Sequence, residues 1–399
     1  MERAGSPSAP SLSPSQWLPS QVPVRFFPWK GKALEGDPVD PVDPVDPVDP
    51  VDPVDPVEPS DSTSECRAYD LPDSGLLLAA YRKMVVGRRF DEQATALARQ
   101  GRLAVHPSSL GQEACQVGAA LALRPTDWLF PTYRDCVALV SRGIDPVETL
   151  TLLRGDGHCG YDPVRHRTAP QCTPLATHAA HATGLAHGER LKGTDTVALA
   201  LVGDGATSEG DFHEALGIAG VLRAPVVFLV QNNRYAISVP LSAQSAAPGL
   251  AYKGVGYGVR SEQVDGNDVA AVLAVLGKAV EEARSGGGPW LVEAHTYRMA
   301  PHTSADDPSR YRPAEEAEHW RGRDPIDRLE NWLREHGLLT EDDIRAVAAE
   351  AEAYAADVRI RLAEDPALDP LSLFDHVFST PTPQLTEQRA ALRAELEGN

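Results

Sequence analysis

The sequence predicts an α/β protein in which a parallel sheet is covered by helices on both faces. Three runs, "VALALV" at 197–202, "APVVFLVQNN" at 224–233 and "PWLVEAHTY" at 289–297, are short and largely apolar, as strands buried on both faces of a sheet are. Two segments with helical periodicity, 208–222 and 268–284, lie between them. Because strands and helices alternate, we expect successive strands to lie parallel in one sheet.

Two helices are expected before the first of these strands. The segment 74–103 has apolar residues at helical spacing and begins at Asp73 or Ser74, either of which can cap a helix N-terminus. A second helix is expected at 110–123, where the sequence is "LGQEACQVGAALAL".

Composition divides the chain into three regions. Residues 1–65 are rich in Pro, Ser and Asp and contain Asp-Pro-Val seven times in succession at 37–57. Proline fixes φ and the aspartates repel one another, so we expect a disordered, extended N-terminal segment that is either a tether or a repeat without function. We expect the folded domain at 66–330 and a helical C-terminal extension at 331–399.

Charge and hydropathy exclude several classes of partner. The net charge of −20 argues against nucleic acid, and no apolar run reaches the roughly 18 residues of a membrane span. The five cysteines form an odd set without a Cys-x-x-Cys pair, which indicates free thiols in a reducing compartment. We therefore expect a cytoplasmic protein with no nucleic-acid and no membrane partner.

The stretch "VGDGATSEGDF" at 202–212 places acidic residues directly after a buried strand. Asp204 lies there between two glycines, and Asn233 ends the next strand. Because the carboxyl ends of parallel strands meet at one edge of a sheet, we expect the two side chains to converge. A carboxylate and an amide oxygen suit Mg²⁺, whose other ligands would come from a diphosphate and water. The N-terminus of the intervening helix favours the same anion.

These two residues belong to a longer pattern, in which Gly-Asp-Gly is followed after 26 residues by Asn-Asn. The pattern resembles the thiamine diphosphate motif. That resemblance implies that Asp204, Asn233 and the backbone carbonyl of Tyr235 bind Mg²⁺. It also implies cofactor contacts from the rest of the turn, namely Gly203, Gly205 and Ala206.

Arg234 departs from the motif, which usually has glycine at this position. If the position requires a positive φ, arginine costs on the order of 1 kcal/mol there. A chain that binds the cofactor without catalysing a reaction is therefore one alternative.

Other segments extend the resemblance over roughly 75–330. They are "LGQEACQVG", "FPTYRDC", "CTPLATH", "GDGATSEGDFHEA", "NNRYAIS" and "YRMAPHTSADDPSRYR". Together they are similar to the alpha subunit of the thiamine-diphosphate-dependent decarboxylating component of 2-oxo acid dehydrogenase complexes. The resemblance implies the thiamine-diphosphate-binding fold. It also implies further cofactor contacts from Tyr133, Arg134, Thr173, Leu175 and Arg298, with His302 as the catalytic histidine.

The residue types in these segments suit those roles. An arginine such as Arg134 matches a diphosphate oxygen, and Leu175 resembles an apolar wedge that holds the cofactor bent. His302 follows the last strand in a polar loop, and its ordinary titration range suits proton transfer.

The resemblance also implies partners and a reaction. The segment after residue 330 is too short for a second α/β domain, so a beta subunit would supply the glutamate that activates the cofactor, in an assembly of two alpha and two beta chains. The reaction would be oxidative decarboxylation of a small-molecule 2-oxo acid, with transfer of the acyl group to a lipoyl acyltransferase component. Branched-chain substrates are favoured, and pyruvate and acetoin remain open.

A cluster of histidines and cysteines offers an alternative of another class. Within 24 residues the chain has His158, Cys159, His166, Cys172, His178 and His181. Zinc binds these residue types, although the spacing matches no finger or ribbon pattern.

Overall fold

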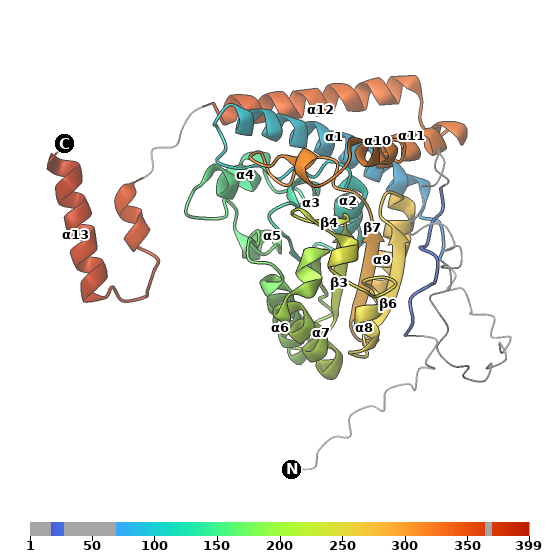
Figure 1. Cartoon of the computed structure of the whole chain (residues 1–399), viewed down its shortest axis with the longest axis horizontal. Coiled ribbons are helices and arrows are strands. Elements are labelled where there is room, and N and C mark those ends of the chain that lie inside the picture. Colours follow the sequence, from blue (N-terminus) through green and yellow to red (C-terminus); the bar gives the residue numbers. More distant parts are fainter. Residues whose placement is uncertain (1–16, 28–68, 364–368, 399) are drawn as a thin grey trace, which may run out of the picture.

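The computed structural model describes residues 17–27, 69–363 and 369–398. Within these residues the main sheet has five parallel strands in the order β1-β2-β3-β7-β6 (Figure 1). The predicted parallel α/β fold is therefore confirmed. The strands are β1 (Trp128–Phe130), β2 (Ala198–Gly203), β3 (Val226–Asn232), β6 (Arg260–Asp265) and β7 (Trp290–His295).

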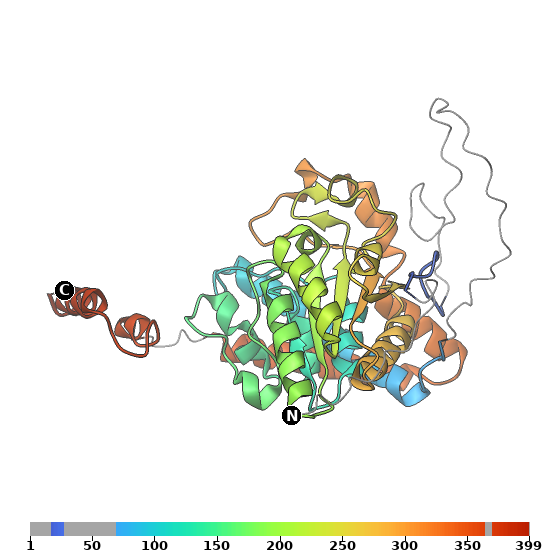
Figure 2. The same cartoon turned by 90° about the horizontal axis from the view of Figure 1, so that it is seen from below.

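Helices cover both faces of this sheet (Figures 1 and 2). On one face α2 (Glu113–Ala122) and α9 (Val269–Arg284) pack against alternate strand residues, whereas on the other face α6 (Thr177–Leu191) and α7 (Gly210–Leu222) pack against the residues between them. Successive side chains of a strand point to opposite faces, so an unbroken apolar strand such as β3 contributes to both cores.

A further helical layer lies outside α2 and α9. It contains α1 (Ser74–Arg99), α11 (Pro325–Glu335) and α12 (Glu341–Arg361) (Figure 1). The side chain of Asp73 caps α1 by accepting from the Leu76 amide. The remaining helices are α3 (Cys136–Ser141), α4 (Pro146–Arg154), α5 (Pro163–His166), α8 (Tyr252–Val255), α10 (Ala314–Arg321) and α13 (Pro383–Gly398).

The edge strand β6 was not expected from the sequence because it is polar, "RSEQVD". Its Glu262 accepts from the Ser20 amide of the N-terminal segment and from the Tyr69 hydroxyl before α1, both at 2.8 Å. Val24 forms a parallel bridge with Val264. Residues 17–27 therefore pack along the sheet edge, which differs from the disorder expected for them, while the Asp-Pro-Val repeat lies outside the described residues.

No helix in the described ranges has both the length and the apolar character that crossing a membrane requires.

The pairing of Phe228 on β3 with Phe212 on α7 allows a test of this core. Both rings are fully buried, and their centroids lie 6.3 Å apart in an edge-to-face arrangement. Phe228→Ala should lower the free energy of unfolding by about 3–5 kcal/mol, because it removes buried apolar surface and leaves a cavity. Urea denaturation measures the change. Ile218→Ala on the outer side of α7, where the side chain is 51% exposed, should cost less than about 1 kcal/mol. Equal losses would contradict this packing.

Candidate functional site

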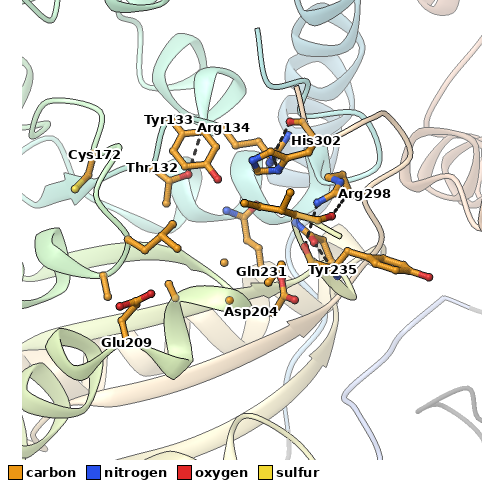
Figure 3. A pocket seen from close by; sticks show the side chains of 18 of the residues that line it. Thr132, Tyr133, Arg134, Cys172, Asp204, Glu209, Gln231, Tyr235, Arg298 and His302 are labelled. Atoms are coloured by element: carbon orange, nitrogen blue, oxygen red, sulfur yellow. Dashed lines mark hydrogen bonds between the residues drawn. The ribbon is translucent and has the colours of Figure 1, made fainter. Parts of the chain in front are cut away.

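A pocket lies at the carboxyl ends of β2 and β3 (Figure 3). The loops after β1, β2, β3 and β7 contribute to its wall, together with the segment that leads into α6. Most residues proposed from the sequence come together here: Tyr133, Arg134, Leu175, Gly203, Asp204, Gly205, Ala206, Asn233, Tyr235, Arg298 and His302. Thr173 is not among the lining residues, although its neighbours Cys172 and Pro174 are.

The side chains of Asp204 and Asn233 meet inside this pocket. Where Asn233 Nδ2 donates to Gln112 Oε1 at 3.2 Å, the amide oxygen faces Asp204. In this orientation Asn233 Oδ1 lies 3.2 Å from Asp204 Oδ1 and 3.1 Å from the Tyr235 carbonyl oxygen. Oxygens so close together need a proton or a cation between them. A turned Asn233 amide would supply protons, but Gln112 would then have to turn as well. A divalent cation satisfies the oxygens without either change.

Asp204 is the acidic member of this group, and it is almost completely buried. Gln244 Nε2 donates to its Oδ2 at 2.7 Å. Burial raises the pKa of Asp204, and the hydrogen bond from Gln244 offsets this only in part. Keeping a buried carboxylate ionised lowers the stability of the fold unless a cation lies beside it. The donor set of carboxylate, amide and backbone carbonyl fits Mg²⁺.

Gly205 is required by the close approach of the hairpin formed by β4 (Tyr235–Ala236) and β5 (Val239–Pro240). A Cβ atom at Gly205 would lie 2.7 Å from the Cβ of Ala236. The turn after β2 can therefore press against the hairpin only with glycine at this position.

The same hairpin contains the strained residues of the "NNRYAIS" segment. Arg234 has φ of +76° and Ile237 has φ of +54°. The position where the motif usually has glycine does adopt the left-handed region, so Arg234 and the β-branched Ile237 both carry backbone strain.

Arg134 is clamped above the pocket. Its Nη1 donates to the Ser108 carbonyl at 3.0 Å. Its Nη2 donates to the His302 carbonyl at 3.0 Å and lies 3.1 Å from His302 Nδ1. Since a guanidinium only donates, Nδ1 of His302 accepts and the neutral ring carries its proton on Nε2.

His302 is half-buried beside two arginines. Burial and the charges of Arg134 and Arg298 lower the pKa of His302 to about 4. The ring is therefore neutral at pH 7. Its backbone amide donates to Asp306 Oδ2 at 2.7 Å, and the ring of Tyr133 stands edge-on to it at 6.1 Å between centroids.

Arg298 braces the hairpin against the loop that contains His302. Its Nη1 donates to the Tyr235 carbonyl at 3.1 Å, and its Nη2 donates to the Ile237 carbonyl at 2.6 Å and to the Tyr311 hydroxyl at 2.9 Å. The Tyr235 carbonyl has a second lone pair, so this bond leaves it able to face a cation.

Two buried glutamines of the pocket were missed by the sequence analysis. Within the described residues Gln231 Oε1 and Gln112 Nε2 have no hydrogen-bond partner, although both side chains are buried and line the pocket. Orphaned polar atoms of this kind indicate a site that a polar ligand completes. Gln231 precedes Asn232, and Gln112 lies within an expected helix, so neither has a sequence signal of its own.

Glu209 also lines the pocket, opposite His302 (Figure 3). It is the N-cap of α7 and makes no side-chain capping bond. The N-terminus of α7, the glycine turn and Arg134 together offer backbone amides and a cation to an anion. The pocket therefore suits a diphosphate beside a divalent cation.

The histidine and cysteine cluster gains no support as a metal site. Across the described ranges, no three His, Cys, Asp or Glu side chains are grouped closely enough to hold a metal ion. His178 instead points its Nε2 at the Leu201 carbonyl at 2.5 Å.

Comparison with known proteins gives a consistent result. The family model described as dehydrogenase E1 component matches residues 81–370. The 3-methyl-2-oxobutanoate dehydrogenase subunit alpha of Mycobacterium tuberculosis is 45% identical over 335 residues, which are 84% of this chain and 91% of the relative. The pyruvate dehydrogenase E1 component subunit alpha is 37% identical in Acholeplasma laidlawii, covering 81% of this chain and 94% of the relative, and 38% identical in Bacillus subtilis, covering 72% and 78%.

The burial of Asp204 predicts opposite effects of one substitution with and without a cation. Since the pKa of Asp204 is raised in the folded state, its ionisation does not destabilise the fold below the unfolded-state pKa. The destabilisation grows as the pH rises and is complete above the folded-state pKa. At pH 7 without added cation, Asp204→Asn should raise the unfolding temperature by about 2 °C. Mg²⁺ with inorganic diphosphate should stabilise the wild type and leave the variant unchanged in thermal unfolding. Asp211→Asn is the control and should respond as the wild type; a variant still stabilised by the ligands would contradict the site.

The strain at Arg234 predicts a stabilising substitution. Arg234→Gly should raise the free energy of unfolding by up to about 1 kcal/mol, because glycine adopts a positive φ without steric cost. Arg345→Gly, at an exposed position in the second turn of α12, should lower it by about 1 kcal/mol. Denaturant titration of both variants measures the contrast. A loss of stability in Arg234→Gly would show that the arginine side chain itself stabilises the hairpin.

Proposed function

Since this chain belongs to the dehydrogenase E1 component family, as the alpha subunit of a 2-oxo acid dehydrogenase, we propose that it acts in the oxidative decarboxylation of a branched-chain 2-oxo acid. The acyl group would pass to a lipoyl group of an acyltransferase component. The observation that carries the proposal is the convergence of Asp204, Asn233 and the Tyr235 carbonyl in a pocket that also contains His302. The relative named for 3-methyl-2-oxobutanoate supports the branched-chain substrate, and pyruvate and acetoin are the alternatives.

The family depends on thiamine diphosphate, which when bound supplies the nucleophile and the electron sink for decarboxylation. Asp204, Asn233 and the Tyr235 carbonyl would hold Mg²⁺, and the turn from Gly203 to Ala206 would lie against the diphosphate. Among the described residues, the Nε–H and the second Nη1–H of Arg134 have no partner, in addition to its bonds with Ser108 and His302. These would meet the anion's oxygens.

His302 acts through its Nε2–H. Because Arg134 occupies Nδ1 and the ring is neutral at pH 7, the imidazole can donate a hydrogen bond to an oxygen of the substrate without bringing a positive charge. That hydrogen bond stabilises negative charge that develops on this oxygen during the reaction. The neighbouring Asp306 and Tyr133 hold the loop and the ring in place.

The rim of the pocket supports a partner subunit. Leu175 is 43% exposed and Ile237 is 55% exposed, and both line the pocket. Large apolar side chains exposed at the rim of a polar site are typical of a surface that another protein covers. We propose that a beta subunit docks there and supplies the glutamate that the cofactor needs, in an assembly of two alpha and two beta chains.

We also propose the domain boundaries of the chain and its cellular location. The thiamine-diphosphate domain spans 66–330, although α11 (Pro325–Glu335) continues across residue 330, and the C-terminal extension follows. The buried free thiols of Cys115 and Cys136 support a cytoplasmic location.

Reconstitution with the cognate beta subunit tests the function. We expect decarboxylation of 3-methyl-2-oxobutanoate with a kcat/KM at least about 10-fold above that for pyruvate, and none with the alpha chain alone. His302→Ala should bind thiamine diphosphate as the wild type does and lose about 100-fold or more in kcat.

Three results would contradict this assignment. A wild-type complex that binds thiamine diphosphate with Mg²⁺ but decarboxylates no 2-oxo acid would be the inactive alternative. Stoichiometric zinc with no response to thiamine diphosphate would favour the zinc alternative. An unchanged kcat in His302→Ala would remove the histidine from the mechanism.

A further inference from the structure

A buried carboxylate on α1 connects the outer helical layer to the pocket. Asp91 is 3% exposed. Its Oδ1 accepts from His106 Nε2 at 3.0 Å and from the Ser109 amide at 2.8 Å, and its Oδ2 accepts from the Ser108 hydroxyl at 2.5 Å. These bonds fix the segment 106–109 against α1.

The segment fixed by Asp91 in turn holds Arg134 at both ends. The Ser109 hydroxyl donates to the Arg134 carbonyl at 2.7 Å, and Gln116 Nε2 donates to the same oxygen at 3.2 Å. At the other end of the residue, the Ser108 carbonyl accepts from Arg134 Nη1 at 3.0 Å. The guanidinium therefore has one orientation, and its Nη2 points at Nδ1 and the carbonyl of His302.

We propose that Asp91 is a positioning residue that sets the tautomer of His302 by fixing segment 106–109 and, through it, Arg134. The inference rests on the role proposed above for His302. Asp91 contacts neither the pocket nor His302. It acts on His302 only through Ser108, Ser109 and Arg134.

The chemistry of the carboxylate supports this assignment. Asp91 is charged because its hydrogen bonds and the neighbouring His106 lower its pKa despite burial. A carboxylate accepts on both oxygens, whereas the amide of asparagine accepts on one only. Asp91→Asn therefore leaves His106, Ser108 or Ser109 without an acceptor, and the segment that holds Arg134 has to move.

The effect of such a movement on His302 follows from the groups that face it. Arg134 and Arg298 lower the pKa of His302 to about 4 together with burial, while Asp306 raises it. The ring of Tyr133 packs against it without charge. When Arg134 withdraws, Nδ1 loses its donor, both neutral tautomers become populated, and the pKa of His302 moves up.

The test uses the full chain labelled with ¹⁵N-histidine, with His302 assigned from the spectrum of His302→Gln. The wild type should show Nδ1 unprotonated and Nε2 protonated. In Asp91→Asn we expect a mixture of tautomers and a pKa at least about one unit higher. In the complex with the beta subunit, kcat should fall by up to about 100-fold while KM for the 2-oxo acid changes less than about 3-fold.

Asp127→Asn is the matched control. Asp127 is fully buried and accepts from the Val197 amide at 3.0 Å and from Arg284 Nη2 at 2.8 Å, at the amino end of the sheet. Its loss should destabilise the chain without changing the His302 resonances. If Asp91→Asn likewise destabilises and leaves His302 unchanged, Asp91 is structural only and the inference is wrong.

If Asp91→Asn does not fold, Ser109→Ala tests whether segment 106–109 sets the tautomer of His302 through Arg134. It removes only the hydroxyl that donates to the Arg134 carbonyl, and it should shift His302 in the same direction by a smaller amount; an unchanged histidine overturns the inference. The tautomer is measured without cofactor or partner. A tautomer shift without a change in kcat would therefore contradict the role of His302, not the role of Asp91.

Discussion

The parallel register of β2 and β3 is the constraint on which the pocket depends. Gly203 pairs with Gln231 near the carboxyl ends of the two strands. Asp204, which directly follows β2, and Asn233, which directly follows β3, therefore leave the sheet side by side. A slip of one residue would exchange the two faces of a strand and bury the wrong side chains. The two apolar cores therefore hold the register that brings the acid and the amide together.

A second pairing brings the histidine to the same place. β3 pairs with β7 up to Asn232 and His295, and the chain after β7 stays attached to the segment after β3. The amides of Thr296 and Arg298 donate to the carbonyls of Asn232 and Asn233 at 3.0 and 3.3 Å. Asn232 itself turns away from the pocket to donate to Glu293. The second asparagine of the motif thus faces the pocket, and the first fixes the strand that precedes the loop containing His302.

The sequence was sufficient for the parts of the structure that local patterns encode. The apolar strands and the glycine-flanked Asp204 have periodicity or spacing that predicts their place, and Arg234 was expected to be strained only if its φ was positive, as it is. Gln231 and Asp91 could not be found in this way. Asp91 acts through residues 15 to 18 positions away and, through them, on an arginine further along the chain. Polar contacts between distant segments leave no periodic signal.

The charges of the pocket imply that one ligand would shift two proton equilibria in opposite directions. In the chain alone, burial raises the pKa of Asp204, and burial with two arginines lowers the pKa of His302 to about 4. A cation beside Asp204 would favour its ionised form, because the opposite charge offsets the cost of burial. A diphosphate beside Arg134 would offset the arginine charges and return the histidine toward its ordinary range, where it exchanges protons near neutral pH. A cofactor that completed the proposed metal site would then prepare the histidine for proton transfer, since Arg134 both contacts the histidine and lines the pocket.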